Sequence, residues 1–367
     1  MRLPLVSGAW AMCLVALLAL ACGRARGPDS TTSSTDTMEA GSGGAPPSAP
    51  GEPELLYDMG TLRPRGIVYA ERQLYFGAFP PHPRPGYEFY QAPADASSPP
   101  QLLGMINTPD AGVAGQVIAA TEDYVFWAEA SRLVRYERTT ASIEHFDSNF
   151  APGLPDARVV LVDEERVAIA QGDCSRISLF EIESMKRKTF EIEPLKNDAL
   201  AAQLLVVGQT FYCSSQQRIL VLDLKSGESR DIYLTPAGRH LDEFIGFRDA
   251  IYVAHSAPHD KVTLERLDPS SAASKHILDL EGEVYLSMVA DEARSAIFAV
   301  PATANDENLY KIAVDSWQVS QFRGLAKLRS DVVQDEDYLY WSTDNLLDKD
   351  PQYRTGIYRQ LKDAPTQ

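Results

Sequence analysis

VFWAEA, residues 125–130, is one of seven short apolar segments that share a frame and recur at intervals of roughly 40 to 50 residues. The other six are LYFGAF (74–79), VAIAQG (167–172), FYCSSQ (211–216), IYVAHS (251–256), IFAVPA (297–302) and LYWSTD (339–344). Their second residues form a column, which consists of Tyr75, Phe126, Ala168, Tyr212, Tyr252, Phe298 and Tyr340. A fixed period of this size, built from strand-like segments, is typical of a β-propeller.

Each repeat divides into four strands. The fourth repeat, for example, contains QLLVVG, TFYCSSQ, RILVLDLKSG and SRDIYL in that order. Apolar and polar residues alternate well over residues 218–223, as they do in a half-buried strand. We therefore predict an all-β fold, a seven-bladed β-propeller with four-stranded blades. A six-bladed ring with one irregular unit is the alternative.

The last repeat supplies only three strands, SDVVQD, YLYWSTD and GIYRQLK. A lone segment, ELLYDM at residues 54–59, resembles the fourth strands of other repeats and precedes the first repeat. Pairing the two would complete the last blade and remove an exposed sheet edge. The sequence thus predicts that the N-terminal strand closes the ring.

The composition limits the partners of the chain. The 367 residues carry a formal net charge of −17, with a sequence pI of about 4.8. This balance argues against nucleic acid, whose phosphates need a basic surface, and against an anionic bilayer surface. It favours a soluble, monomeric domain that is kept apart from its copies by charge repulsion.

The N-terminus has the pattern of a targeting segment. Arg2 is followed by a nearly uncharged stretch over residues 6–20, and then by Ala19-Leu20-Ala21-Cys22-Gly23. The last five residues resemble a bacterial lipobox, although Ala19 stands where Leu is favoured. The resemblance implies that Cys22 is the lipid anchor and that Gly23, in place of Asp, directs the protein to the outer rather than the inner membrane. An ordinary secretory signal with an incidental cysteine is the alternative.

These patterns divide the chain into three parts. We expect a lipoprotein signal peptide at residues 1–21 and a propeller at residues 54–363. Between them, residues 22–53 are rich in Ser, Thr, Gly and Pro and have little to bury, so we expect a disordered tether.

The last repeat also carries a second resemblance. LYWSTDNLL followed by GIYRQL resembles the YWTD-type repeat, in which an aromatic pair precedes Thr-Asp and an Ile-aromatic-Arg strand follows. The match lies in Tyr340, Trp341, Thr343, Asp344, Ile357 and Arg359. The other repeats keep only its apolar frame. The resemblance implies a propeller and nothing about the biology of that family.

Two cysteines remain for the folded domain, because Cys13 leaves with the signal and Cys22 takes the lipid. Cys174 and Cys213 fall in neighbouring repeats. Cys174 lies at the end of the second strand of the third repeat or in the turn after it, and Cys213 lies within the second strand of the fourth repeat. An exported protein with two remaining cysteines favours a disulfide between them. Two free buried cysteines are the alternative, since the offset between the strands can exceed the reach of a disulfide.

Metal-binding and catalytic patterns are weak. His255 and His259, with Asp260, have the spacing of a zinc pair, but they lie on a strand that runs into a turn at Pro258. Asp344, Asp348 and Asp350 could hold calcium, but their segment lacks the glycine and terminal glutamate of an EF-hand. The sequence shows no nucleophile elbow, phosphate-binding loop or dinucleotide fingerprint. We expect no cofactor, with calcium as the alternative.

The longest connections between second and third strands are residues 80–86, 257–261, 302–308 and 343–355, which all leave from one face of a propeller. The last combines acidic, aromatic and Arg side chains, and its candidate binding residues are Asp344, Asp348, Asp350, Tyr353 and Arg354. We predict a membrane-anchored envelope protein that binds a protein partner or ligand on this face. Two alternatives stay open: a metal-dependent hydrolase or lyase using acids at the channel mouth, and a structural factor in envelope assembly.

Overall fold

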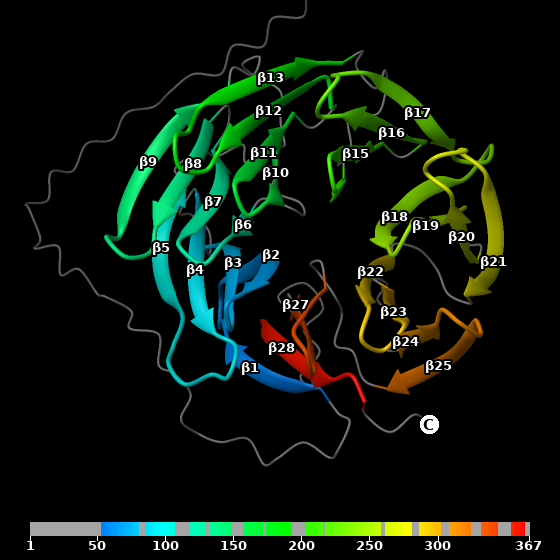
Figure 1. Cartoon of the computed structure of the whole chain (residues 1–367). Helices are drawn as coiled ribbons and strands as arrows, with labels where there is room; N and C mark the ends of the chain where they lie inside the picture. Colours follow the sequence, from blue (N-terminus) through cyan, green and yellow to red (C-terminus); the bar gives the residue numbers. More distant parts are fainter. Residues whose placement is uncertain are drawn as a thin grey trace, which may run out of the picture. The chain divides into compact units, whose positions relative to one another are not determined.

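The computed structural model describes residues 53–80, 86–106, 118–129, 132–148, 157–171, 174–192, 203–215, 217–257, 261–280, 286–301, 308–323, 332–343 and 354–363. Within these residues the chain forms 28 strands and no helix. The strands make seven four-stranded antiparallel sheets, which stand as blades around a ring (Figure 1). The predicted seven-bladed propeller is therefore confirmed, and the six-bladed alternative is wrong.

The first three blades follow the chain without interruption. Blade 1 contains β2 (Arg63–Ala70), β3 (Gln73–Phe79), β4 (Tyr87–Pro93) and β5 (Gln101–Ile106). Blade 2 contains β6 (Ile118–Ala120), β7 (Tyr124–Glu129), β8 (Arg132–Glu137) and β9 (Ser142–Asp147). Blade 3 contains β10 (Arg158–Asp163), β11 (Arg166–Ala170), β12 (Arg176–Glu181) and β13 (Arg187–Glu191).

The next three blades have the same order of strands. Blade 4 contains β14 (Leu204–Val207), β15 (Thr210–Ser214), β16 (Arg218–Asp223) and β17 (Ser229–Leu234). Blade 5 contains β18 (His240–Phe247), β19 (Ala250–Ser256), β20 (Val262–Leu267) and β21 (Ser274–Leu280). Blade 6 contains β22 (Leu286–Asp291), β23 (Ala296–Pro301), β24 (Asn308–Ala313) and β25 (Gln318–Arg323).

Blade 7 joins the two ends of the described chain. It contains β26 (Val333–Gln334), β27 (Tyr338–Thr343), β28 (Gly356–Leu361) and, as its outer strand, β1 (Glu54–Asp58). β1 pairs antiparallel with β28, with Glu54 opposite Arg359 and Asp58 opposite Gly356, and the two strands lie side by side in Figure 1. Closure by the N-terminal strand is therefore confirmed.

The column residues occupy one equivalent position in all seven blades. Each member lies on the second strand and is paired with an apolar residue of the first strand, the seven partners being Val68, Ala119, Val160, Leu205, Ile245, Val289 and Val333. The column residues are all buried. The period read from the sequence is therefore the spacing between equivalent core positions.

Alternation along each second strand assigns its two faces to two neighbours. Phe126 packs with Val167 and Ile169 of blade 3, whereas the flanking Val125 and Trp127 pack with the core residues of blade 1. The same division holds in every described blade, so each interface between neighbours has its own apolar cluster. Because the second and third strands are buried on both faces, whereas an outer strand such as β9 is largely exposed, each blade depends on its neighbours for its core.

A buried ion pair fixes the last strand to blade 6. Lys362, just after β28, lies 2.7 Å from the Asp291 carboxylate, and both side chains are almost fully buried. Lys362 also donates to the Asp335 carbonyl at 2.6 Å, and Arg294 bridges Asp291 and Asp363. Burial alone would raise the pKa of Asp291, but the Lys362 hydrogen bond and the nearby Arg294 hold it below its usual value.

Candidate functional site: the loop face

The propeller has two unlike faces. We call the face with the connections between first and second strands, and between third and fourth strands, the hairpin face. Its turns are short and closed by local hydrogen bonds. In the β16–β17 turn, for example, the main-chain N–H groups of Lys225 and Ser226 both donate to Asp223 Oδ1 at 2.8 Å, and Gly227 has φ 81°. Local hydrogen bonds of this kind define a tight turn between two antiparallel strands.

The opposite face, which we call the loop face, carries the other connections. The four predicted loops do run from second to third strands, as the bounds of β3–β4, β19–β20, β23–β24 and β27–β28 show. The connections from one blade to the next, which the sequence did not single out, leave from the same face. Residues 107–117, 148–157, 192–203 and 324–332 are the long examples. The loop face thus differs from blade to blade over a constant frame of strands.

Of the predicted binding residues, the structure describes Arg354. Its guanidinium is largely exposed and lies 3.0 Å from the Asp58 carboxylate. Its main chain is held by Tyr358, whose hydroxyl accepts from the Arg354 N–H at 3.0 Å and donates to the Arg354 carbonyl at 2.9 Å. Asp344, Asp348, Asp350 and Tyr353 lie outside the described residues, as do the proposed lipid anchor Cys22 and the segments 1–21 and 22–52.

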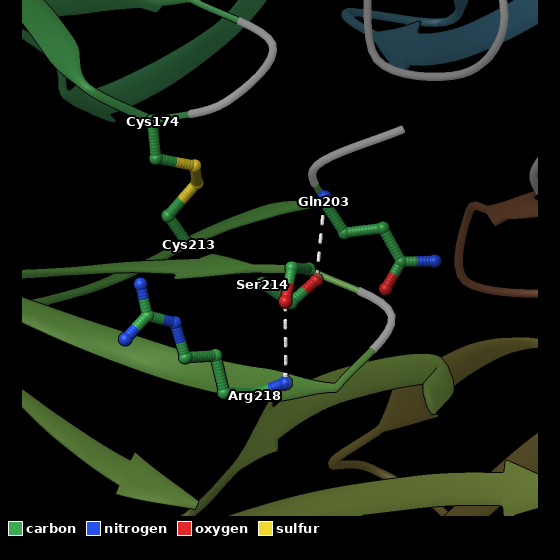
Figure 2. The surroundings of a disulfide bond; sticks show 6 residues. Cys174, Gln203, Cys213, Ser214 and Arg218 are labelled. Atoms are coloured by element: carbon green, nitrogen blue, oxygen red, sulfur yellow. Dashed lines mark hydrogen bonds between the residues drawn. A yellow bond between two sulfur atoms is a disulfide. The ribbon is translucent and has the colours of Figure 1, made fainter. Parts of the chain in front are cut away.

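The two cysteines of the folded domain join blades 3 and 4. Cys213 lies on β15 beside the column residue Tyr212, so it faces the preceding blade, and Cys174 reaches it from the turn after β11 (Figure 2). The structure places a disulfide between them, with a Cα–Cα separation of 6.4 Å. This separation is within the usual range, so the offset between the blades does not prevent the bond.

Three polar residues meet at the loop-face end of blades 4 and 5. Asp242 lies on the first strand of blade 5 and is 8% exposed. Its Oδ1 accepts a hydrogen bond from Ser256, at the end of β19, at 3.0 Å. Its main-chain carbonyl accepts from Gln203 Nε2, just before β14, at 3.0 Å. Gln203 is itself held by its main-chain N–H, which donates to Ser214 Oγ (Figure 2).

Burial dominates the electrostatics of Asp242. It raises the pKa of this carboxyl to about 6, although the Ser256 hydrogen bond and the nearby His240 and Arg239 act in the opposite direction. Among the described residues, the buried Oδ2 atom has no hydrogen-bond partner, and the same is true of Gln203 Oε1. Sequence reasoning missed this site. The signal that could have found it is the acidic pair Asp242-Glu243 inside a first strand, because the first strands β6, β10 and β14 are largely apolar.

His255 lies on the other side of the same strand end. It is buried between blades 4 and 5, with Nε2 3.6 Å from Glu265 and its ring centroid 6.4 Å from that of Tyr233. Burial lowers the pKa of His255 below its usual value, against the opposing charge of Glu265. His259 and Asp260 lie outside the described residues. The described part of the zinc-like spacing is therefore a core histidine.

No three His, Cys, Asp or Glu side chains among the described residues gather in the manner of a metal centre. None of the chain that the structure describes forms a helix long and apolar enough to cross a membrane.

No protein-family model matches the sequence, and no curated protein matches it. Solved structures share the fold. Virginiamycin B lyase from Staphylococcus aureus has a TM-score of 0.61 at 12% identity, covering 84% of this chain and 98% of that one. Oligogalacturonate lyase in complex with manganese has a TM-score of 0.58 at 11% identity, covering 86% of this chain and 97% of that one.

A sensor domain is similar to the same degree. The extracellular domain of a proposed one-component system from B. thetaiotaomicron has a TM-score of 0.57 at 11% identity. The match covers 84% of this chain and 40% of that one, so this chain spans about two fifths of the length of that protein. At such identities the likeness shows the fold alone, which lyases and sensor domains both use.

Proposed function

We propose that this chain is a lipid-anchored protein of the bacterial cell envelope whose propeller binds a protein partner or ligand on the loop face. The observation that carries the proposal is the contrast between the two faces. The hairpin-face connections span two to seven residues, whereas the five longest connections, which span nine to twelve residues, all leave from the loop face. Variable connections over a rigid frame are how repeat folds acquire binding sites.

Arg354 is the best-defined point of contact on that face. Tyr358 fixes its main chain, which reduces the conformational freedom that binding would otherwise remove. Its guanidinium is exposed and is paired with the Asp58 carboxylate at the surface, which is a weak interaction that a partner can replace. Arg is among the residue types that contribute most to protein interfaces.

The experiment is capture from the native cell envelope by the purified, lipidated protein, followed by titration of the captured partner. Arg354→Ala should weaken the complex about tenfold or more. The matched control is Arg248→Ala, because Arg248 is an exposed arginine on the hairpin face that is likewise paired with one carboxylate, that of Asp315. Equal losses in the two variants, or no loss in either, would contradict a site on the loop face.

The anchor is tested separately. Acylation holds a protein to a membrane through buried methylene groups, so Cys22→Ala should move the protein from the membrane fraction to the soluble fraction. Labelling with a palmitate analogue should be lost in the same variant. Unchanged fractionation without labelling of the wild type would contradict the lipoprotein assignment, and partner capture would be unaffected by that result.

An enzyme is the second candidate. Asp242 is a buried carboxyl with a raised pKa at the loop-face end of the ring, a combination found at catalytic sites. Two lyases share the fold. A metal-dependent hydrolase or lyase would carry bound metal through purification, which elemental analysis detects. A structural factor in envelope assembly would instead co-purify with the machinery that inserts outer-membrane proteins.

A further inference from the structure

We propose that His255 is a pH-sensitive contact between blades 4 and 5, which holds their loop-face ends together at neutral pH and loosens them in mild acid. His255 lies near the end of β19 and is 2% exposed. The alternation of side chains along β19 turns it towards blade 4, as it does Val253, which packs there with Tyr233. This inference does not depend on capture of a partner by Arg354.

The imidazole ring of His255 is buried in a setting that suits its neutral form. Among the described residues, neither ring nitrogen has a hydrogen-bond partner. The nearest carboxylate oxygen, Glu265 Oε1, lies 3.6 Å from Nε2, which is longer than a hydrogen bond. A neutral imidazole has one N–H group to satisfy, whereas an imidazolium has two and carries a charge. Protonation therefore raises the cost of keeping this ring buried between the blades.

The groups that face the ring oppose one another. They are Tyr233 from β17, Arg239 from the β17–β18 connection, the apolar Leu241 from β18, Glu265 from β20, and Asp279 and His276 from β21. Burial, the largest effect, and the charge of Arg239 favour the neutral ring, whereas Glu265 and Asp279 favour the imidazolium. The outcome is a pKa of His255 below its usual value.

The direction of this pKa sets the sign of the effect. Where the blades separate, His255 regains water and titrates at its ordinary value of 6.5. Below that value the open interface takes up a proton that the closed interface lacks. Closure is therefore strongest above about pH 7 and weakens as the pH falls through 6.5. Asp242 has the opposite trend, but it is bonded to Ser256, so substitutions of His255 leave that contact in place.

Arg239 connects this contact to the loop face. Its Nη2 donates to the His255 carbonyl at 3.3 Å, to the Lys261 carbonyl at 2.7 Å and to Thr263 Oγ1 at 3.1 Å. Arg239 belongs to the connection between β17 and β18, and Lys261 directly precedes β20. One side chain thus joins two loop-face connections to the strand that carries His255. Because an imidazolium repels this guanidinium, a proton on His255 also weakens the hold on both connections.

The test is hydrogen exchange of the full-length protein from pH 7.5 to pH 4.5, corrected for the intrinsic effect of pH, together with NMR titration of its histidines. His255 should titrate below pH 6.5. Between pH 7.5 and pH 5.5, opening of β17 and β19 should rise about five- to tenfold in wild type relative to His255→Gln, which cannot titrate. His145→Gln is the matched control, because His145 is a more exposed histidine on blade 2, paired with Glu129. It should respond as wild type does.

Glu265→Gln provides a second variant should His255→Gln fail to fold. Loss of this carboxylate favours the neutral ring further, so exchange should go on rising below the pH at which that of wild type levels off. Titration of His255 at or above pH 6.5, an equal rise in wild type and His255→Gln, or no extension to lower pH in Glu265→Gln would each overturn the proposal. Equal changes in His145→Gln and His255→Gln would also overturn it, because they would show a general effect of acid on the ring of blades.

Discussion

Asp242 is the residue at which burial and charge conflict most directly. In the folded protein burial raises the pKa of this carboxyl to about 6, whereas the unfolded value is near 3.8. Between these two values the folded state holds a proton that the unfolded state has released. Stability from this group is therefore greatest below pH 4 and falls as the pH rises towards 6.

Asparagine at this position removes the titration. Asp242→Asn should gain stability relative to wild type as the pH rises from 4 to 7, by about 3 kcal/mol, since one pKa unit corresponds to about 1.4 kcal/mol. Urea unfolding at several pH values measures the difference. A difference that stays constant with pH would show that the carboxyl is not buried in its ionised form.

The burial and the contacts of Asp242 could not be predicted from the sequence. The apolar alternation identified the core, and all seven column residues are buried. The position of Asp242 depends on a β-bulge between Leu241 and Glu243, which places it against Ser256. Neither the bulge nor the approach of Gln203 from the preceding blade leaves a local signal, because both arise from the packing of the ring.

Among the elements, the turns of the hairpin face repeat one conformation. The fifth residue of several third-to-fourth-strand turns has a positive φ and donates its N–H to the first, as Gly227 does to Asp223 and Ala272 to Asp268. Glycine adopts this backbone without the steric cost that a Cβ incurs. Ala272, with φ 58°, therefore carries local strain that Gly227 avoids.

Ala272→Gly should stabilise the protein by up to about 1 kcal/mol, because relief of the strained φ exceeds the entropy that glycine adds to the unfolded chain. Ala273→Gly is the control at the neighbouring position, where no positive φ occurs, and it should be neutral or destabilising. Chemical denaturation compares the two. Greater stability of Ala273→Gly than of Ala272→Gly would contradict the turn conformation.

The disulfide acts between two elements, and it closes a loop with a sequence separation of 39. Chain-entropy arithmetic for such a loop gives about 3 to 4 kcal/mol of stabilisation. Cys174→Ala/Cys213→Ala should lose about this amount, and peptide mapping of the exported wild type without reductant should recover the linked pair. Two thiols open to alkylation in the unfolded, unreduced wild type would show that the bond is absent.

The sequence indicated this pair but could not settle it. Compartment and cysteine count favoured a bond, whereas the alternation of faces along β15, which directs Cys213 to the preceding blade, became visible only with the strand register. The connections 107–117 and 192–203 were overlooked for a related reason. The repeat is clearest in the second strands, so the sequence indicates the loops that follow those strands more clearly than the connections between blades.

At the scale of the whole molecule, the ring depends on its closure. β1 brings Glu54 to Arg359 and places the Tyr57 hydroxyl 2.5 Å from the Pro93 carbonyl, so it connects blade 7 to blade 1. Deleting residues 54–59 should lower the melting temperature far more than deleting residues 23–49, because only the first removes a paired strand.

A point substitution tests the same closure more gently. A Cβ on Gly356 would lie 2.3 Å from the Tyr57 carbonyl oxygen, so Gly356→Ala should weaken the pairing of β1 with β28 and lower the melting temperature. Gly104→Ala is a milder control, because its nearest neighbour is a Trp127 side-chain atom at 3.2 Å. For the deletions described above, equal melting temperatures of the proteins that lack residues 54–59 and residues 23–49 would contradict closure by β1.

The central claim is that the loop face of this ring is its binding surface. Its most direct test is to replace residues 344–353 by a tight Asn-Gly turn and to compare partner capture from the native envelope with circular dichroism melts. We expect the fold to stay intact and capture to be abolished, while the hairpin-face variant Arg248→Ala captures normally. Capture at wild-type yield by the shortened, folded protein would show that the binding site lies elsewhere.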